Sequence, residues 1–521
     1  MPRSLFFAYV ETGMQASTLL PSAFGDRAAR KAAVARAAAR APSAALLAEL
    51  EVQQAALPAS AARQRALETL ARPGTAAVVT GQQVGLFLGP LYTIYKAATA
   101  VALAEALAVE TGTPCVPIFW MATEDHDFAE IDHCTISRGA DPPLRLRVSG
   151  DGRSDAREPV VEARLGADVT AAVAAVRDAL AGRPAGAEVA ALLAEHYRPG
   201  ARFAEAFAGL LAALFADEGL LVFHPRTAGA AALAAPVYRH ALLHAGEIAT
   251  RLAARDAALA EAGFDSQVHV RADASLVFAL DERGARQLVR VDEAPARAAD
   301  VAAQPLGFSA SALLRPIVQD SLFPTAAYVG GPAECSYFGQ TAALYELFEL
   351  PVPLVAPRAR FRLVDGRTRA RLDKLGVTPA AVEQPMEALF AAVGALRPAP
   401  VAPAELRAAI LDAPLEALAS LPGRIGIADR QLARAFVRTR ATLERAVDRL
   451  TARYARTLAL RDEECATALQ RARAVLFPDG EPQERVFAFP SFAADAGARA
   501  FVAGILAAVR PFDPAVQDLE R

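Results

Sequence analysis

Lysine, cysteine and tryptophan are scarce in this chain of 521 residues, whose one tryptophan is Trp120. The four cysteines are far apart and include no CxxC pair, so the sequence indicates neither a disulfide framework nor a zinc site. We expect each cysteine to be a small buried side chain. Cys335, which lies in a glycine-rich stretch, is kept as a candidate thiol near a site.

Long apolar runs are also missing. No uncharged apolar run approaches the ~20 residues that cross a bilayer. The first residues lack a basic leader followed by an apolar stretch and a small-residue cleavage site. These absences predict a cytoplasmic protein with no membrane partner.

Neither sign of charge dominates the chain. The 58 acidic residues slightly exceed the 55 basic ones, for a net charge of −3, so we expect no nucleic-acid partner. Only three basic residues are lysines (Lys31, Lys96 and Lys374), and we attribute most of the arginine and alanine excess to a base-composition bias. Hydrophobic residues make up 54%, which excludes wholesale disorder and, at this length, favours two or three structural units.

Alternating strand and helix patterns predict an α/β fold with a parallel sheet. An apolar run at residues 76–80 is followed by a glycine-spaced loop, a helix over residues 91–110 and a second apolar run at residues 115–120. The remaining predicted strands of this sheet are residues 219–224, 326–329 and 352–356. Alternation over residues 267–292 predicts an inserted antiparallel ribbon.

The predicted strands stop after about residue 376. We therefore divide the chain into a core over residues 1–375, with N-terminal helices and inserted segments at about 138–310, and a helical coiled-coil arm over residues 376–475. The C-terminal segment, residues 476–521, is expected to pack back on the core.

Within the arm, residues 427–461 carry apolar side chains at spacings of three and four, which predict an amphipathic helix with coiled-coil character. These side chains are Leu432, Phe436, Leu443, Val447, Leu450, Tyr454 and Leu458. The arginines at near-helical spacing on the same segment are Arg430, Arg434, Arg438, Arg445, Arg449 and Arg453. The arginine row is either a solvated helix face or a surface for an anion or an acidic partner.

Three segments with unusual residues follow predicted strands, where open parallel sheets bind their ligands. The first is the loop at residues 81–90, whose glycines allow close backbone approach, although it matches neither a GxGxxG nor a Walker A motif. Its candidate binding residues are Gly81, Gln82, Gln83, Gly85, Gly89, Tyr92 and Lys96. A compact lysine ammonium suits a phosphate or a carboxylate.

The second segment follows Trp120 and places four ionisable residues in a row: Glu124, Asp125, His126 and Asp127. Carboxylates that flank an imidazole can orient it and make it a general base. The same carboxylates could instead bind a divalent cation, and a plain polar loop is the third possibility.

The third segment places Gly330 and Gly331 before Glu334 at the start of a predicted helix. Glu334 is either a cap that matches the helix dipole or a group that binds a substrate amine. Arg358, after the last predicted strand, is a candidate carboxylate clamp. By their positions, all three segments could share one face of the sheet.

Several long motifs resemble those of the cysteine ligases of bacillithiol biosynthesis, the BshC family. They are VTGQQVGLFLGPLYTIYK at residues 79–96, VPIFWMATEDHD at 116–127, LRPIVQD at 314–320, FPTAAYVGGPAE at 323–334 and QERV at 483–486. The resemblance implies a Rossmann-like core with connecting insertions and a coiled-coil arm that pairs two subunits. It also implies the last step of bacillithiol biosynthesis, the joining of cysteine to glucosaminyl-malate through an amide.

The resemblance leaves the activation chemistry open. The core is similar to adenylate-forming nucleotidyltransferase folds, but residues 89–96 lack the histidine pair of those relatives, so ATP or ADP and a divalent cation remain possible cofactors. Our hypothesis is a ligase in which His126 transfers a proton, Asp125 or Asp127 orients it, and Lys96 holds a phosphate or carboxylate. The alternatives are a non-catalytic nucleotide- or metabolite-binding protein and a coiled-coil interaction protein.

Overall fold

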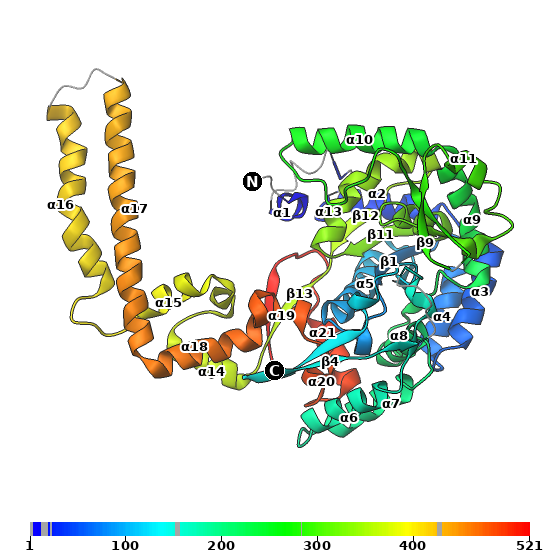
Figure 1. Ribbon diagram of the computed structural model, residues 1–521, viewed down its shortest axis with the longest axis horizontal. Helices are drawn as coiled ribbons and strands as arrows, with labels where there is room; N and C mark the ends of the chain where they lie inside the picture. Colours follow the sequence, from blue (N-terminus) through cyan, green and yellow to red (C-terminus); the bar gives the residue numbers. More distant parts are fainter. Residues whose placement is uncertain (1–3, 12–18, 21–22, 152–156, 283, 425–429) are drawn as a thin grey trace. The chain divides into compact units, whose positions relative to one another are not determined.

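The computed structural model describes residues 4–11, 19–20, 23–151, 157–282, 284–424 and 430–521. The chain forms two compact units (Figure 1). The first unit comprises Met1–Ser137, Pro143–Phe361 and Glu484–Gln517, and the second comprises Arg138–Pro142, Arg362–Gln483 and Asp518–Arg521.

The core of the first unit is a parallel five-stranded sheet in the order β12–β11–β1–β2–β7. Its strands are β1 (Ala76–Gln82), β2 (Cys115–Met121), β7 (Leu221–Phe223), β11 (Thr325–Gly330) and β12 (Leu354–Pro357). Parallel strands covered on both faces read as continuous apolar runs, and every residue of β11 is buried. The predicted α/β class is confirmed, and all five strands lie within two residues of their predicted ends.

β1 lies at the centre of this sheet, where Val79 is in register with Ile118 of β2 and Tyr328 of β11. The chain runs from β1 outward to β2 and β7, and later returns to the other side of β1 for β11 and β12. The strand order therefore reverses between β1 and β11. In open parallel sheets, the ligand crevice lies beyond the carboxyl ends of the strands at such a reversal.

Helices surround the sheet of the first unit (Figure 1). They are α1 (Leu5–Glu11), α2 (Arg27–Ala38), α3 (Ala44–Ala55), α4 (Ala61–Leu70), α5 (Tyr92–Thr111), α6 (Val169–Ala179), α7 (Gly186–His196), α8 (Phe203–Leu214), α9 (Ala228–Leu243), α10 (Ala245–Glu261), α11 (Ala294–Arg297), α12 (Arg315–Leu322), α13 (Pro332–Thr341), α19 (Gln483–Val486), α20 (Pro490–Ala493) and α21 (Ala498–Ala508). Side chains of Asp26, Ser43 and Ser60 cap the first turns of α2, α3 and α4, which explains where these helices begin. α5 is long and apolar enough to cross a bilayer by composition, but most of it is buried and it packs against β1 and β2.

The inserted segments of the first unit carry a second sheet, with the antiparallel order β10–β8–β9. Its strands are β8 (Ala274–Leu280), β9 (Arg286–Arg290) and β10 (Phe308–Ala310). The predicted antiparallel ribbon is thus confirmed, although residues 267–273 precede its first strand. The two short strand pairs are β3 (His133–Arg138) with β4 (Asp141–Arg147) and β5 (Gly150–Asp151) with β6 (Arg164–Leu165).

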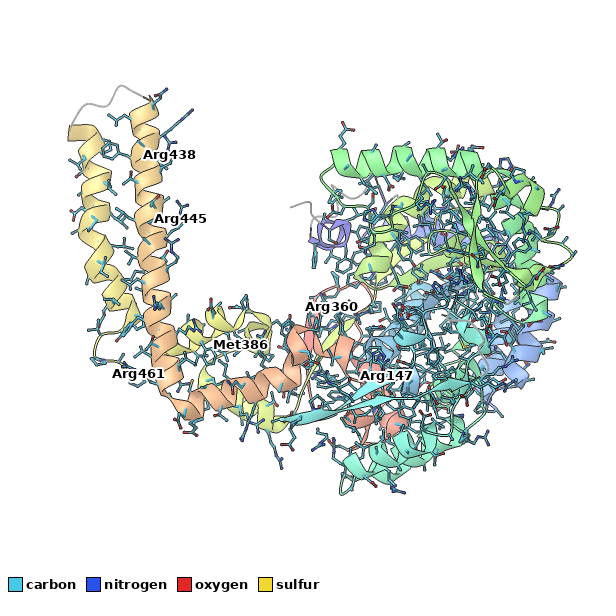
Figure 2. All side chains as sticks on the ribbon, viewed as in Figure 1. Arg147, Arg360, Met386, Arg438, Arg445 and Arg461 are labelled. Carbon is cyan, nitrogen blue, oxygen red and sulfur yellow. The ribbon has the colours of Figure 1, made fainter. Side chains whose placement is uncertain are left out.

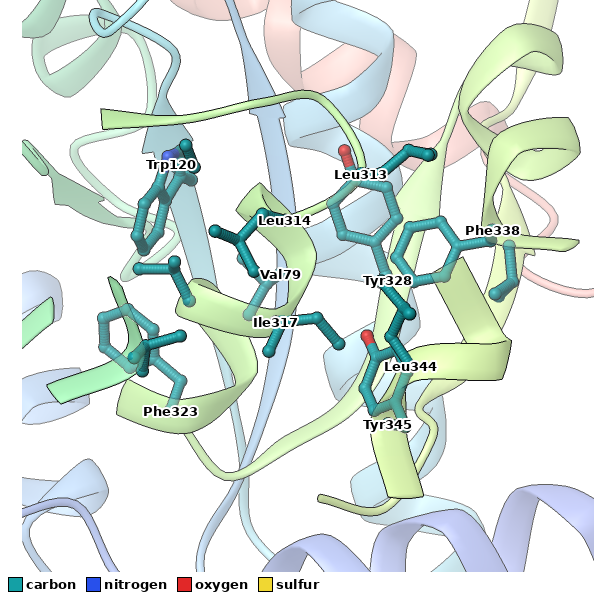
Figure 3. Close-up of a cluster of buried hydrophobic side chains, with 14 of the residues drawn as sticks. Val79, Trp120, Leu313, Leu314, Ile317, Phe323, Tyr328, Phe338, Leu344 and Tyr345 are labelled. Carbon is teal, nitrogen blue, oxygen red and sulfur yellow. The ribbon is translucent and has the colours of Figure 1, made fainter. Parts of the chain in front are cut away.

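α12, which follows the inserted segment, packs against the main sheet. Figure 3 shows Leu314 and Ile317 next to Val79 of β1. Trp120 and Phe323 lie on one side of this contact, with ring centroids 6.5 Å apart. The buried cluster therefore ties the LRPIVQD motif to the strands that carry the other motifs.

The second unit is mostly helical. Its helices are α14 (Gly366–Leu375), α15 (Met386–Ala395), α16 (Pro403–Arg424), α17 (Arg430–Arg461) and α18 (Glu463–Leu476), and it also contains most of β13 (Arg360–Val364) and of β14 (Val516–Glu520). The expectation that strands stop after about residue 376 is wrong, because β14 pairs with β13. β14 has the sequence VQDLE, which contains no apolar run, so its pairing leaves no mark in the sequence pattern.

The division between the units lies at Phe361, earlier than residue 375, where we drew it from the sequence. α14 accounts for the difference, because it packs against α18. Leu372 joins Val475 and Leu476 in a buried cluster of the second unit. Glu484–Gln517 belongs to the first unit.

α17 is the long amphipathic helix that the heptad spacing predicts, and it packs against α15, α16 and α18 of its own chain. α16 and α17 run side by side in Figure 1, and Figure 2 labels Arg438, Arg445 and Arg461 along α17. Val447 is buried, whereas Leu443 and Leu450 are 37% and 50% exposed. Residues 427–429 of the predicted helix, and the side chain of Arg430, lie outside the part of the chain that the structure describes.

Candidate functional site

A cavity of about 680 Å³ lies beyond the carboxyl ends of β1, β2 and β11, at the reversal of strand order. Trp120 and Tyr328, both drawn in Figure 3, belong to its wall. The candidate residues that the cavity brings together are Gly81, Gln82, Gln83, Tyr92, Lys96, Trp120, Glu124, Asp125, His126, Gly331, Glu334 and Arg358. The three segments singled out in the sequence therefore meet at one site.

Four candidate residues lie outside the cavity wall: Gly85, Gly89, Gly330 and Asp127. Gly85 has a packing reason, because a Cβ there would lie 2.4 Å from the carbonyl oxygen of Gly89. The side chain of Asp127 is exposed. The glycine spacing of the first loop thus reflects, in part, a turn too tight for side chains.

Lys96 of α5 lies at the floor of the cavity and is buried. Its Nζ donates hydrogen bonds to Gly81 O at 2.8 Å and to Gln82 Oε1 at 2.7 Å, and it forms an ion pair with Glu334. An ammonium has three N–H donors, so these three acceptors use all of them. A ligand anion can contact Lys96 directly only by displacing one of the three.

Glu334 of α13 is a carboxylate despite its burial. Burial itself raises the pKa of its carboxyl group, but the charge of Lys96 and hydrogen bonds from Lys96, Tyr328 and the Gly331 N–H hold that pKa below its usual value. Burial lowers the pKa of the Lys96 ammonium, and the charge of Glu334 opposes that change. The pair therefore joins α5, which follows β1, to α13, which follows β11.

Arg358, which follows β12, clamps a carboxylate of its own chain. Its NH1 and NH2 groups donate to the two carboxylate oxygens of Glu484 at 2.8 and 2.7 Å, and both side chains are buried. Glu484 belongs to the QERV motif, and Arg360, labelled in Figure 2, lies 3.5 Å from the same carboxylate. The Arg358 guanidinium, which the sequence suggests as a clamp for a substrate carboxylate, therefore already binds Glu484.

His126 lies in the cavity wall with its side chain 44% exposed. Its Nδ1 is 3.2 Å from Asp125 Oδ1. Arg286 NH1 donates to the same Asp125 oxygen at 3.2 Å, and Gln83 Nε2 donates to Asp125 Oδ2 at 3.2 Å. Asp125 is therefore held from three directions, which fixes the carboxylate beside the imidazole.

The remaining carboxylate of this loop in the wall, Glu124, is buried and accepts a hydrogen bond from Tyr238 Oη at 2.8 Å. Glu124 and Asp125 thus have separate partners. Within the described ranges, no group of three His, Cys, Asp or Glu side chains is placed to hold a metal ion. In this arrangement, the acidic loop does not fit a divalent cation held by the protein alone.

Cys335 is a packing residue beside the cavity rather than part of its wall. The side chain is buried, and its Sγ donates to Gly330 O at 3.6 Å. Burial raises the pKa of the Cys335 thiol, so the thiol is protonated at neutral pH. All four cysteines are free of disulfides.

The wall also contains residues that sequence reasoning missed: His269, Arg271, Arg286, Arg315, Tyr337 and Arg485. Arg315 and Arg485 lie inside the LRPIVQD and QERV motifs, so these motifs could have identified both residues as site candidates. Arg271 and Arg286 come from the inserted segment, where only tertiary packing brings them to the cavity.

The motifs and the two units have counterparts in known families. Residues 2–359 match the family described as "Bacillithiol biosynthesis BshC, N-terminal Rossmann-like domain". Residues 361–517 match "Bacillithiol biosynthesis BshC, C-terminal coiled-coil domain". The change from one match to the next coincides with the observed division between the units.

Relatives resemble the chain over most of its length. A protein of Solibacter usitatus named "Putative cysteine ligase BshC" is 35% identical over 463 residues, which cover 87% of this chain and 85% of the relative. Proteins with the same name from Salinibacter ruber and Geobacillus thermodenitrificans are 33% and 28% identical, and they cover 92% and 82% of this chain and 90% and 81% of the relatives.

Proposed function

Because the chain belongs to the BshC family of bacillithiol biosynthesis, we propose that it is a ligase that joins cysteine to glucosaminyl-malate through an amide bond, in the last step of that pathway. The observation that carries the proposal is the cavity at the reversal of strand order. It combines an oriented histidine with a buried network of charged side chains.

In the proposed reaction, the amine of glucosaminyl-malate attacks the carboxyl carbon of an activated cysteine. A C–N bond forms, the C–O bond to the leaving group breaks, and the leaving oxygen departs with the electron pair. His126 accepts the proton that the amine loses, and its exposed fraction lets it exchange that proton with water. Asp125 positions the imidazole, because its Oδ1 lies 3.2 Å from the His126 Nδ1; Arg286 NH1 lies 3.4 Å from the same nitrogen.

Lys96 has a positioning role in this proposal. Its bonds fix Gly81, Gln82 and Glu334 at the ends of two strands, so the backbone of the first loop is set before substrate arrives. The ammonium also adds positive potential where negative charge develops on the carboxyl oxygen. Supplying one nucleotide at a time shows whether ATP activates the cysteine carboxyl.

We further propose a cytoplasmic homodimer that pairs through the arm. Supporting this, Leu443 and Leu450 are exposed on α17, one heptad apart, on a helix that already packs against α15 and α16 with its buried face. A second copy of the same helix is apolar in the same positions and suits such a seam.

The test supplies the purified full chain with cysteine, glucosaminyl-malate and one nucleotide at a time, with a no-nucleotide arm, and measures the thiol-sugar product by mass spectrometry. We expect product in at least one arm, and a large loss of rate in His126→Asn, which keeps a similar shape without the base. Asp127→Asn is the matched control, because Asp127 is exposed and outside the wall. No product in any arm, with ligand binding intact, would indicate a non-catalytic binding protein.

A further inference from the structure

Among the described residues, Arg315 is a cation of the cavity wall with no carboxylate within ion-pair distance. It begins α12 inside the LRPIVQD motif, a motif to which the proposed reaction assigns no role. In the part of the chain that the structure describes, no carboxylate oxygen forms an ion pair with Arg315. Its NH1 donates to Gln319 Oε1 at 2.9 Å, and its NH2 donates to the Tyr337 hydroxyl at 3.2 Å.

The Arg315 guanidinium also lies over an aromatic ring. Its central carbon lies 5.1 Å from the centroid of the Tyr328 ring. Lys96 and Arg358, the neighbouring cations of the same wall, each have a carboxylate within ion-pair distance. Among the described residues, Arg315 therefore differs from both of them in having no carboxylate within ion-pair distance, although the charge of Glu334 acts on it from farther away.

The nearest acid on the same helix, Asp320, does not neutralise Arg315 directly. Gln319 stands between them, because its Nε2 donates to Asp320 Oδ1 at 2.8 Å while its Oε1 accepts from Arg315. Burial raises the pKa of the Asp320 carboxyl, although hydrogen bonds from Tyr345 and other neighbours oppose that change. Its second oxygen is taken by the Tyr345 hydroxyl.

The position of Arg315 adds to the excess of positive charge. A cation at a helix N-terminus meets the positive end of the helix dipole, the less favourable end for it. Burial is the main cause that lowers the pKa of Lys96, and Arg358 and Arg315 lower it further, which shows that the positive charges reach one another across the site. Burial lowers the pKa of the Arg315 guanidinium, but Tyr328, Tyr337 and Glu334 outweigh burial and raise it, so Arg315 stays a cation. A partly buried cation of this kind gains from a counter-charge in direct contact.

We propose that Arg315 binds a carboxylate group of the substrate in this cavity, with the Tyr337 hydroxyl beside it as a second polar contact. A guanidinium is the side chain best shaped to hold a carboxylate through two parallel hydrogen bonds. The inference rests on the proposed function, whose two substrates both bear carboxylates. The shared chemistry is the carboxylate, and it comes either from the malate portion of one substrate or from the amino acid.

The test is a titration of the full chain with malate, with malamide and with cysteine, followed by calorimetry and by fluorescence of Trp120, which lies in the same wall. Wild-type protein is expected to bind malate or cysteine, and the one that binds through Arg315 identifies the source. Malamide, which has the shape of malate without the charges, is expected to bind at least tenfold more weakly.

Arg315→Met is expected to raise the dissociation constant of that carboxylate at least tenfold, and Arg315→Lys, which keeps the charge but loses the planar fork, to raise it less. Arg290→Met is the matched control, because Arg290 lies on β9 outside the wall and its acidic neighbour Asp273 keeps Arg271 as a partner. We expect that control to change the constant less than twofold.

Arg315→Met protein that binds both carboxylates as wild type does would overturn the inference. Where malate is the carboxylate that the wild type binds, equal binding of malate and malamide would overturn it too. If Arg315→Met fails to fold, the inference is tested by the wild-type comparison of malate with malamide and by the binding constants of Arg315→Lys. Product formation is measured separately on the same preparations. Carboxylate binding through Arg315 without product contradicts the ligase function alone, whereas product formation with binding unaffected by Arg315 contradicts this inference alone.

Discussion

At the scale of single residues, Lys96 is a compact, buried ammonium surrounded by three oxygen acceptors. Arginine would keep the charge, but its planar fork points donors in other directions and needs more room. We predict that Lys96→Arg lowers kcat/KM at least tenfold, which corresponds to about 1.4 kcal/mol of transition-state stabilisation. Steady-state kinetics on the purified variant measures this loss.

Lys374→Arg is the control for that substitution. Lys374 is exposed and forms an ion pair with Glu464 on the surface of the second unit. Arginine can make the same exposed pair, so we expect the kinetics to be unchanged. If Lys96→Arg keeps the kcat and KM of the wild type, the compact shape of the lysine ammonium is not required for activity.

His224, directly after β7, predicts a pH dependence of stability. Burial, and to a lesser extent Arg226 and Arg202, lower the pKa of its imidazole to about 4. Between pH 6.5 and 4 the unfolded chain binds a proton at this residue and the folded chain does not, so stability falls as the pH falls. We expect a loss on the order of 2 kcal/mol from this residue between pH 7 and pH 5.

The measurement is urea denaturation of wild type and His224→Asn at pH 7 and pH 5. The amide of asparagine does not titrate in this range. The variant should therefore lose less stability on acidification than the wild type does. Equal losses in the two proteins would mean that His224 is not a buried neutral imidazole.

Single residues also show what sequence reasoning can reach in the site. Lys96 and His126 stand out in the sequence because a rare lysine and a row of ionisable residues follow apolar strands, and both lie in the cavity wall. Arg286 could not be found in this way, because its contact with Asp125 depends on how the inserted sheet packs. Nor does sequence show that Arg358 is already held by Glu484, 126 residues away.

At the scale of elements, the buried pair of Arg358 and Glu484 fastens α19 to the end of β12. Removing one partner of a buried pair leaves an uncompensated charge, which typically costs about 3–5 kcal/mol. We predict a destabilisation of this size for Glu484→Ala in urea denaturation. The double variant Arg358→Met/Glu484→Leu, which removes both charges, should be less destabilised.

Glu464→Ala provides the comparison for an exposed ion pair, since its partner Lys374 remains solvated. We expect a change of about 1 kcal/mol or less. If Glu484→Ala were as mild as Glu464→Ala, the clamp would not hold α19 to the strand.

The exposed leucines of α17 test the proposed dimer. A charge placed at the centre of an apolar seam disrupts helix pairing, so Leu443→Arg and Leu450→Arg should sediment as monomers where the wild type sediments as a dimer. Val109→Arg is the control, because Val109 is exposed on α5 in the first unit. A wild type that is monomeric at micromolar concentration would contradict the dimer.

Elements with strong local patterns could be predicted from sequence, and weakly patterned ones could not. The five buried strands of the main sheet are apolar runs between turn signals, which explains why their positions are confirmed. β14 has no such run and forms only because β13 lies beside it. The end of the first unit is likewise fixed by packing of α14 on α18, a contact between segments far apart in the sequence.

At the scale of the whole molecule, the chain divides near residue 360 both in its structure and in its matches to the BshC family, although Glu484–Gln517, inside the coiled-coil match, belongs to the first unit. The cavity, its oriented histidine and its cations all belong to the first unit. We therefore propose that this unit forms an amide from the carboxyl group of cysteine.

Cysteine labelled with ¹⁸O in both carboxyl oxygens tests that claim most directly. The full chain is incubated with labelled cysteine, glucosaminyl-malate and the nucleotide that supports turnover, and the product is weighed by mass spectrometry. Amide formation breaks one C–O bond, so the account predicts a product that keeps one of the two labels. A product that keeps both labels would be joined through another atom of cysteine and would contradict the account, as would the absence of product.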